Sequence, residues 1–502
     1  MSYVSEISSQ SFTAVKWSVL GTAVRYGLQI SAQIVLARLL GPENYGLFAM
    51  GLVVLTFSNF FAHLGLAWGL VQSRDLSKDD VRFVFTWQVI SGILVALGLY
   101  TLAPAVASYF NEGRLESIVR WLSLACLINA AAAPATNLLR RDLDFRALNI
   151  IEVVSYSIGY VAIGIPLAYN GAGVWALVAA WLSQALCSLV LLVIRHPHPV
   201  RPLFWHAGAT ALSSVGITVF ATNICNWLLN NLDRVLLARF LNAQAVGLYV
   251  VGYNLATTPN SLLVGAVQPV FLAAGARVQS EPERLRRVYL SVLATIWVLI
   301  TPMFVLIAIV AQHLVNLLYG PAWASTGVVL AIVALAMPAY MTWGMSTPIL
   351  WNTGGKHLES LLQLPILAIA AVAFYQLASG GIIVVALVLA GVLFARAIVI
   401  TTAACRRLGI VLGDVLPFAA RGAMTTLLAA AGAFVGLKLG YIPGTEATIL
   451  AGGLLGGCSI VTAVALVFPA LLGQTVLEML GHFSLALSAA LGGPVRASAG
   501  KR

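Results

Sequence analysis

Residues 37–51 read ARLLGPENYGLFAMG, and residues 238–252 read ARFLNAQAVGLYVVG. At a constant offset of 201 positions the two stretches share six residues, and an aromatic side chain follows at Phe48 and Tyr249. The identical pairs are Ala37/Ala238, Arg38/Arg239, Leu40/Leu241, Gly46/Gly247, Leu47/Leu248 and Gly51/Gly252. Each stretch joins two long apolar segments, so the chain is predicted to carry the same helix–turn–helix twice. A chance match between two Leu- and Gly-rich hairpins stays open as the alternative.

The composition excludes a soluble protein. Of the 502 residues, 60% are hydrophobic and only 9% are charged, whereas about a quarter of the residues in a soluble domain are charged. The first apolar run has no small-residue cleavage site after it, so we expect it to be retained as a span and not removed as a signal peptide.

Polar breaks and Pro/Gly punctuation divide the chain into fourteen apolar segments, each long enough to cross a bilayer core of about 30 Å. The sequence thus predicts an all-α integral membrane protein. The predicted spans are 15–37, 44–70, 83–105, 117–138, 150–169, 173–194, 207–231, 244–272, 288–310, 324–350, 360–377, 381–404, 418–438 and 446–471.

Lysine and arginine lie mainly on one side of this topology. With the N-terminus in the cytoplasm, 20 of the 28 basic residues fall on the cytoplasmic side and six on the other. This bias predicts that both termini are cytoplasmic. The net charge of +11 is then a topology signal that also attracts anionic membrane lipid, and it does not indicate nucleic acid as a partner.

The two copies of the turn are six spans apart and so have the same orientation. This is the pattern of a parallel repeat, with two pseudo-symmetric six-helix lobes around a central cavity. We expect an N-terminal lobe at 1–204, a C-terminal lobe at 205–405, two additional helices at 406–472, and a cytoplasmic tail at 473–502 with a possible interfacial helix.

The first span carries a polar stripe at helical spacing, formed by Ser18, Thr22, Arg25, Gln29 and Gln33. Arg25 lies too deep in the span to reach the interface easily, and a buried guanidinium needs an anion. Arginine suits a diphosphate through paired hydrogen bonds, so we predict a substrate-binding cavity here. The alternative is a structural ion pair, with Glu152 or Asp233 as the acid.

The seventh span carries a second stripe, Asn223, Asn226 and Asn230, continued by Arg234. These residues are predicted to form the second cavity wall, and hydrogen bonding between helices is the alternative.

Asp233, Arg38 and Arg239 are candidates for coupling-ion binding or for a gate at the outer end. For Asp233 we favour structural pairing with Arg239 or Arg38, and for the two arginines anchoring at the interface is equally compatible.

Two other groups of residues have less specific interpretations. Arg396 lies late in the twelfth span, where we expect its side chain to snorkel to the interface. Trp343 and Trp351 in the tenth span could stack on sugar rings, although interfacial aromatic residues are common. The five cysteines form no C-x-x-C pair, so neither a metal site nor a disulfide framework is expected.

The chain resembles the bacterial polysaccharide flippases of the O-antigen, colanic-acid and exopolysaccharide kind, which share a superfamily with lipid II flippases and multidrug exporters. The resemblance lies in ARLLGPENYGLFAMG, in NNLDRVLLARFLNAQAVGLYVVGYNLATTPN at 230–260, and in LLRRDLDFRALNIIEVVSYSIGYV at 138–161. It implies alternating-access transport of undecaprenyl-pyrophosphate-linked glycan from the cytoplasmic to the periplasmic leaflet of the bacterial inner membrane. Polysaccharide polymerase and co-polymerase proteins are implied as possible partners.

Other functions remain as alternatives. A cation-coupled multidrug exporter or a lipid II flippase of the same superfamily is the closer one. The more distant is a membrane enzyme, such as a polysaccharide polymerase, but the outer loops are short and carry few carboxylates. Asp142 and Asp144 form a D-x-D pair that surface charge pairing explains better than metal binding. No catalytic residue is assigned and no cofactor is expected, since no phosphate-binding G-x-x-x-x-G-K-[ST] motif is present.

Overall fold

The computed structural model describes residues 2–63, 66–72, 76–206, 209, 227–228, 230–277, 281–442 and 444–467, with side chains of the first helix from Arg25 onward. Helix α1 runs over Ser2–His63 and contains both the first predicted span and most of the second. It bends at Gly41, whose φ of 74° is a left-handed conformation that favours glycine, and Pro42 follows directly. The predicted turn between the first two spans is therefore a sharp kink.

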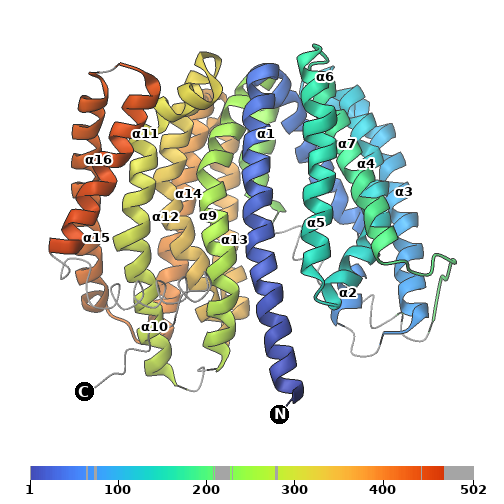
Figure 1. Cartoon of the computed structure of the whole chain (residues 1–502), viewed down its shortest axis with the longest axis horizontal. Coiled ribbons are helices and arrows are strands. Elements are labelled where there is room, and N and C mark those ends of the chain that lie inside the picture. The colour runs from blue at the N-terminus through green and yellow to red at the C-terminus, as the bar shows by residue number, and fades with distance from the viewer. Residues whose placement is uncertain are drawn as a thin grey trace. The chain divides into compact units, whose positions relative to one another are not determined.

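The remaining helices follow one another with short connections (Figure 1). In the first half they are α2 (Leu66–Gln72), α3 (Lys78–Tyr109), α4 (Leu115–Arg141), α5 (Phe145–Tyr156) continued by η1 (Ser157–Gly164) and α6 (Ile165–Tyr169), and α7 (Val174–Arg195). After a helical stretch at 230–240 come α9 (Ala243–Arg277), α10 (Pro282–Thr295) continued by η2 (Ile296–Ile300) and α11 (Thr301–Tyr319), η3 (Pro321–Trp323), α12 (Ala324–Asn352), α13 (Lys356–Leu377), η4 (Ala378–Gly380), α14 (Ile382–Arg407), α15 (Leu412–Gly440) and α16 (Glu446–Val467).

Local sequence sets several helix ends. Ser77 caps α3: its hydroxyl accepts a hydrogen bond from the Asp80 backbone nitrogen at 3.0 Å, and the Asp80 carboxylate accepts from the Ser77 nitrogen at 2.8 Å. This reciprocal capping box satisfies backbone donors that the first turn leaves free. Asp144 likewise caps α5 by accepting from the Ala147 nitrogen at 3.1 Å.

In the described part of the chain, eleven helices are long and apolar enough to cross a membrane. Helices satisfy their backbone hydrogen bonds internally, which a hydrocarbon environment requires. The prediction of an all-α, multi-pass membrane protein is confirmed. The count of fourteen spans stays a prediction, because most of the predicted span at 207–231 lies outside the described residues and α1 contains two predicted spans in one helix.

The chain forms two compact units. Unit 1 comprises Met1–Val250 with Phe374–Ile382, and unit 2 comprises Val251–Ala373 with Ile383–Arg502. The predicted lobe boundaries at 204/205 and 405/406 stay predictions.

Within unit 1 the two copies of the repeated turn meet each other. A Cβ atom placed on Gly46 would overlap the carbonyl oxygen of Ala243, and one placed on Gly247 would overlap the carbonyl oxygen of Pro42. Pro42 and Ala243 are themselves equivalent positions of the repeat, so the contact is reciprocal. Two backbones can approach this closely only where neither helix carries a side chain.

A second pair of equivalent glycines makes corresponding contacts inside each unit. Gly51 faces α4 in unit 1, where an added Cβ would lie 2.8 Å from Leu122 Cδ1. Gly252 faces α12 in unit 2, where an added Cβ would lie 3.0 Å from the Thr326 carbonyl oxygen. Each contacted helix follows two spans after its turn, so the repeat extends beyond the turn into the packing of the helices.

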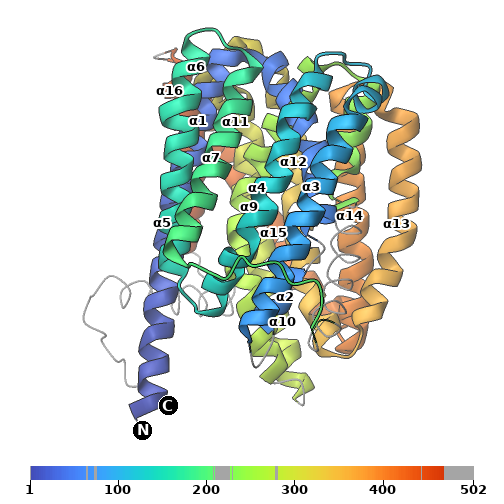
Figure 2. The same ribbon diagram turned by 90° about the vertical axis from the view of Figure 1, so that its right-hand side faces the viewer.

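The segment after α7 runs along α3, which lies beside α4 in unit 1 (Figure 2). Arg82 Nε donates to the Arg201 carbonyl oxygen at 3.1 Å, the Leu203 nitrogen donates to Thr86 Oγ1 at 2.9 Å, and Trp87 Nε1 donates to the Phe204 carbonyl oxygen at 3.0 Å. The connection leading to the second copy of the repeat is therefore held to the first unit by side chains of one helix.

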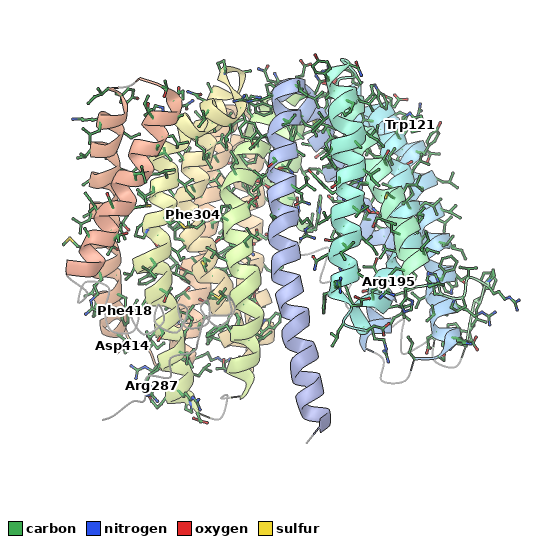
Figure 3. The ribbon with its side chains drawn as sticks, viewed as in Figure 1. Trp121, Arg195, Arg287, Phe304, Asp414 and Phe418 are labelled. Atoms are coloured by element: carbon green, nitrogen blue, oxygen red, sulfur yellow. The ribbon has the colours of Figure 1, made fainter. Side chains whose placement is uncertain are left out.

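In unit 2, α15 and α16 pack through small residues. A Cβ on Gly436 would overlap the Gly452 carbonyl oxygen, and one on Gly456 would overlap that of Gly432. Phe304 of α11, labelled in Figure 3, is fully buried in this unit, whereas Trp121 of α4 in unit 1 is 54% exposed. Large apolar side chains that remain exposed, such as Trp121, are as expected for helices that face lipid.

Replacing Gly46 with alanine should lower the thermal unfolding midpoint of the full chain in detergent. The added methyl group overlaps the facing backbone, and overpacking of this kind costs about 1–3 kcal/mol.

Gly98→Ala is the matched control. An added Cβ at Gly98 in α3 meets nothing within 4 Å, and alanine stabilises a helix by up to about 1 kcal/mol relative to glycine. Equal midpoints for the Gly46→Ala and Gly98→Ala proteins would contradict the reciprocal contact.

Candidate functional site

One side of the candidate site lies between α1 and α5, which pack together in unit 1. Arg25 of α1 forms an ion pair with Glu152 of α5. One helical turn further along both helices, the Tyr156 hydroxyl donates to the Gln29 carbonyl oxygen at 3.4 Å. The structural ion pair considered for Arg25 is therefore present, and its acid is Glu152.

The ion pair is only partly screened by protein. The side chain of Arg25 is 26% exposed and that of Glu152 is 42% exposed. The Arg25 guanidinium also lies 5.2 Å from the centroid of the Tyr26 ring. Its Nε atom, however, is buried and has no hydrogen-bond partner among the residues that the structure describes. A guanidinium with an unused donor can bind a further acceptor without giving up Glu152.

The helix that carries Glu152 changes its winding directly after the site. Tyr156 ends α5, and a π-helical stretch follows over Ser157–Gly164. The rings of Tyr156 and Tyr160 stack with their centroids 4.4 Å apart. Short π-helical stretches inside α-helices occur frequently at functional sites.

The second predicted stripe is described only in part. Asn223 and Asn226 lie outside the described residues, as does the side chain of Thr22 in the first stripe. Asn230 is exposed. Arg234 Nη1 donates to Asn231 Oδ1 at 3.0 Å, and Asn231 Nδ2 donates to the Trp227 carbonyl oxygen at 3.0 Å. The residues described in this stripe therefore support one another along their own helix.

The two stripes occupy equivalent positions of the repeat. At the offset of 201 that relates the turns, each polar residue of the first stripe corresponds to a polar residue of the second. The pairs are Thr22/Asn223, Arg25/Asn226, Gln29/Asn230 and Gln33/Arg234. Each stripe thus carries one arginine, placed at a different depth of its helix.

Asp233 lies in a buried polar contact. It is 3% exposed, and its Oδ2 accepts a hydrogen bond from the Tyr249 hydroxyl at 2.6 Å. The equivalent positions of the first copy are Ala32 and Phe48, both buried and apolar. The second copy of the repeat therefore replaces an apolar contact with a hydrogen bond from tyrosine to carboxylate.

Arginines surround the repeated turns. Arg38 is exposed, and the Arg239 guanidinium lies 5.3 Å from the centroid of the Tyr109 ring. In the loop after α3, Arg114 pairs with Glu43 of the first turn at 2.8 Å and with Glu112 at 2.9 Å. Hydrogen bonding from Arg114 lowers the pKa of Glu112, which keeps this loop carboxylate ionised at neutral pH.

The D-x-D pair has structural partners, as charge pairing predicts. Asp144 pairs with Arg195, which Figure 3 labels at the end of α7, and Asp142 lies 3.1 Å from His196. Both acids therefore bind basic groups that end or follow one helix.

The prediction that Arg396 snorkels to the interface is wrong. Arg396 of α14 is 2% exposed, and its guanidinium lies 3.6 Å from the centroid of the Trp343 ring in unit 2. Its Nη2 atom donates to Gln363 Oε1 at 2.6 Å. Because α13 and α12 supply these partners, the side chain is held inside the protein and does not extend to the interface.

A buried carboxylate completes this second polar cluster. Gln363 Nε2 donates to Glu359 Oε1 at 3.0 Å, and Thr347 Oγ1 donates to the same oxygen at 2.9 Å. Trp351 Nε1 donates to Glu359 Oε2 at 2.6 Å. Trp351 therefore binds a carboxylate through its indole nitrogen. The signal in the sequence is the four-residue spacing of Glu359 and Gln363, which places both on one helix face.

Replacing Arg396 with methionine should destabilise unit 2. Removing one partner of a buried ionic network leaves the other charge uncompensated, at a cost of about 3–5 kcal/mol. The thermal unfolding midpoint in detergent measures this, and the double variant Arg396→Met/Glu359→Gln should recover part of the loss.

Arg406→Met is the matched control, because Arg406 is an exposed residue of the same helix. The same midpoint for Arg396→Met and Arg406→Met would show that the buried network contributes nothing to stability.

Known structures share this fold. The lipid II flippase MurJ in an inward closed conformation superposes with a TM-score of 0.70 at 12% identity, covering 90% of this chain and 98% of that one. An inward-facing multidrug-resistance transporter of the MATE family gives a TM-score of 0.59 at 16% identity, covering 79% of this chain and 98% of that chain. These similarities establish a transporter fold with helical repeats.

Sequence comparison finds relatives in polysaccharide biosynthesis. The succinoglycan biosynthesis transport protein ExoT of Rhizobium meliloti is 28% identical over 322 residues, which are 64% of this chain and 65% of that protein. The lipopolysaccharide biosynthesis protein WzxC of Escherichia coli is 24% identical over 335 residues, 66% of this chain and 67% of that protein. A family model described as "Polysaccharide biosynthesis protein" matches residues 35–327. This match includes both copies of the repeated turn, and the chain belongs to the polysaccharide biosynthesis protein family.

Proposed function

We propose that this protein is a flippase that moves an undecaprenyl-pyrophosphate-linked oligosaccharide from the cytoplasmic to the periplasmic leaflet. The bacterial inner membrane is its proposed location, with both termini in the cytoplasm. Polysaccharide polymerase and co-polymerase proteins are its proposed partners. The printed names of the relatives, a transport protein for succinoglycan and a protein of lipopolysaccharide biosynthesis, support this proposal.

Arg25 is the observation that carries the proposal. A charged residue within a membrane span is costly and by default marks a functional site. Arg25 keeps an unused Nε donor beside its ion pair with Glu152. An arriving diphosphate would accept from this donor and from the other guanidinium nitrogens, since arginine binds such oxygens in pairs. Arg234 would supply the second positive charge.

We assign the outer gate to the reciprocal contact of the repeated turns. Gly46 and Gly247 bring the two backbones together, and no side chain has to be displaced when they part. Opening of this contact would release the headgroup to the periplasm, with Arg38 and Arg239 next to the gate. The lobe boundaries at 204/205 and 405/406 follow from this proposal, because each lobe then contributes one turn.

A cation-coupled multidrug exporter is the second candidate, supported by the fold of the MATE-family transporter. Exporters of cations need exposed carboxylates in their cavity. Here Glu152 already binds Arg25, and Asp233 is buried against Tyr249. The arrangement therefore favours an anionic headgroup.

Arg25→Ala should reduce surface glycan by about tenfold or more in a strain that lacks the chromosomal copy, because the diphosphate loses its cation. Arg25→Lys should restore only part of the export, since lysine cannot form the paired hydrogen bonds. Glu152→Gln should retain export, because it removes only the counter-charge. The measurement is polysaccharide at the cell surface, normalised to the protein level in membranes.

Arg120→Ala is the matched control, since Arg120 pairs with Glu116 on the same helix, α4, and does not contact Arg25. Full export by both Arg25 variants at normal protein levels would remove Arg25 from the mechanism. Equal loss in Arg25→Ala and Glu152→Gln would assign a structural role to the ion pair.

A further inference from the structure

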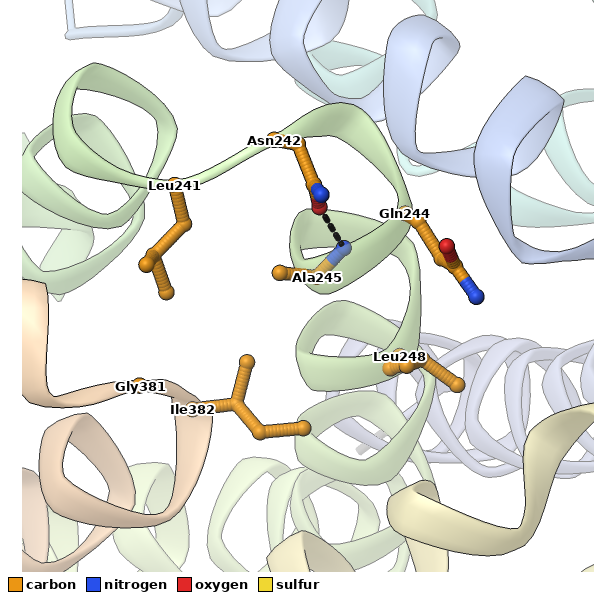
Figure 4. Close-up of a pocket in the computed structure, with 7 residues that line it drawn as sticks. All are labelled: Leu241, Asn242, Gln244, Ala245, Leu248, Gly381 and Ile382. Carbon is orange, nitrogen blue, oxygen red and sulfur yellow. Dashed lines mark hydrogen bonds between the residues drawn. The ribbon is translucent and has the colours of Figure 1, made fainter.

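A pocket of about 260 Å³ lies at the second copy of the repeated turn, within unit 1 (Figure 4). Leu241, Asn242 and Leu248 line it from the turn and from the start of α9. Gly381 and Ile382 line it from the start of α14. The pocket is smaller than the roughly 300–1,000 Å³ typical of sites for drug-sized ligands, so a ligand of one ring suits it.

The pocket exists because one residue differs between the two copies. Ala245 stands where the first copy has Asn44. In the first copy, Asn44 Nδ2 donates to the Leu40 carbonyl oxygen at 2.9 Å, and its amide packs against Gly173, where an added Cβ would lie 3.3 Å from Oδ1. Ala245 has no side chain to fill the corresponding space.

The loops opposite the two turns correspond as well. Gly173 directly precedes α7 with φ of 57°, and Gly381 directly precedes α14 with φ of 98°. Both backbones are left-handed, which favours glycine. Because the surrounding geometry is similar, the change from asparagine to alanine accounts for the open space.

The same comparison shows that the pocket has lost charge. Glu43 in the first copy pairs with Arg114, and its equivalent Gln244 is neutral and lines the pocket. No lining residue is charged. Asn242 Oδ1 accepts from the Ala245 nitrogen at 2.9 Å, the dashed line in Figure 4, which leaves the amide nitrogen as a donor. Leucine and isoleucine side chains beside two amides suit an uncharged ligand with an apolar face and hydroxyl groups.

Two exposed aromatic residues adjoin the lining segments. Phe240 directly precedes Leu241, and Tyr375 lies near the end of α13, shortly before Gly381. Their ring centroids are 5.4 Å apart, and Phe240 and Tyr375 are 37% and 65% exposed. Exposed rings that combine an apolar face with a polar group are suited to the C–H faces and hydroxyls of a sugar.

We propose that this pocket binds one neutral sugar ring of the transported glycan at the outer end of the protein. The proposal rests on the proposed function for its ligand. It assigns different chemistry to the two repeats: the α1–α5 site binds the charged headgroup, and the second turn binds the uncharged glycan.

Ala245→Asn tests the proposal, because it restores the residue of the first copy and fills the pocket. Purified full-length protein in detergent is examined by saturation-transfer NMR with the methyl glycosides of glucose, galactose and mannose. We expect at least one glycoside to receive saturation from the unmodified protein. We expect the signal to fall about tenfold in Ala245→Asn, equivalent to about 1.4 kcal/mol of binding free energy. Ser379→Asn, which adds an amide at an exposed position of the loop before α14, should leave the signal unchanged.

Equal signals from the unmodified and Ala245→Asn proteins would overturn the proposal, as would the absence of signal for all three glycosides. An equal loss in Ser379→Asn would also overturn it, because the effect would not depend on the pocket. Binding is measured without transport. Failure of the Arg25 export test with normal sugar binding would therefore reject only the diphosphate mechanism, and the reverse result would reject only the pocket.

Discussion

The close approach of Gly46 and Gly247 is the constraint on which the arrangement of unit 1 depends. Each glycine faces the carbonyl of the residue equivalent to Pro42 or Ala243 in the other copy, so two stretches far apart in sequence meet about a local twofold relation. Neither contact tolerates a side chain. This explains why glycine stands at the same place in both copies although most of their other residues differ. A joint made only of backbone also has few interactions to break, as a gate requires.

Charged groups inside the helices are arranged in two different ways. Arg25 contacts Glu152 directly, is partly exposed and keeps an unused donor. Arg396 is almost fully buried and is separated from Glu359 by the amide of Gln363. Burying charge is expensive unless it is compensated, and both clusters provide a carboxylate for each arginine. Only the first leaves its arginine open to a ligand, so the first fits substrate binding and the second fits stabilisation of unit 2.

The sequence predicted the helical membrane fold, the repeat and the family, because apolar length and the 201-residue offset are properties of one chain. It also named Glu152 as a possible partner of Arg25. It failed at Arg396, since position along a helix indicates depth in the membrane but not which neighbouring helices cover the side chain. It also missed the pocket, which depends on Ala245 in one copy and Asn44 in the other facing similar loops. That comparison requires knowing which loops lie opposite the turns.

The central claim is that the two turns touch and then separate during transport. Spin labels at Glu43 and Gln244, equivalent exposed positions of the two turns, report their distance by pulsed electron paramagnetic resonance in a variant without native cysteines. The account predicts a short-distance population in the resting protein. It also predicts a second, longer population when lipid-linked glycan from a producing strain is added. The absence of any short-distance population, with or without glycan, would contradict it.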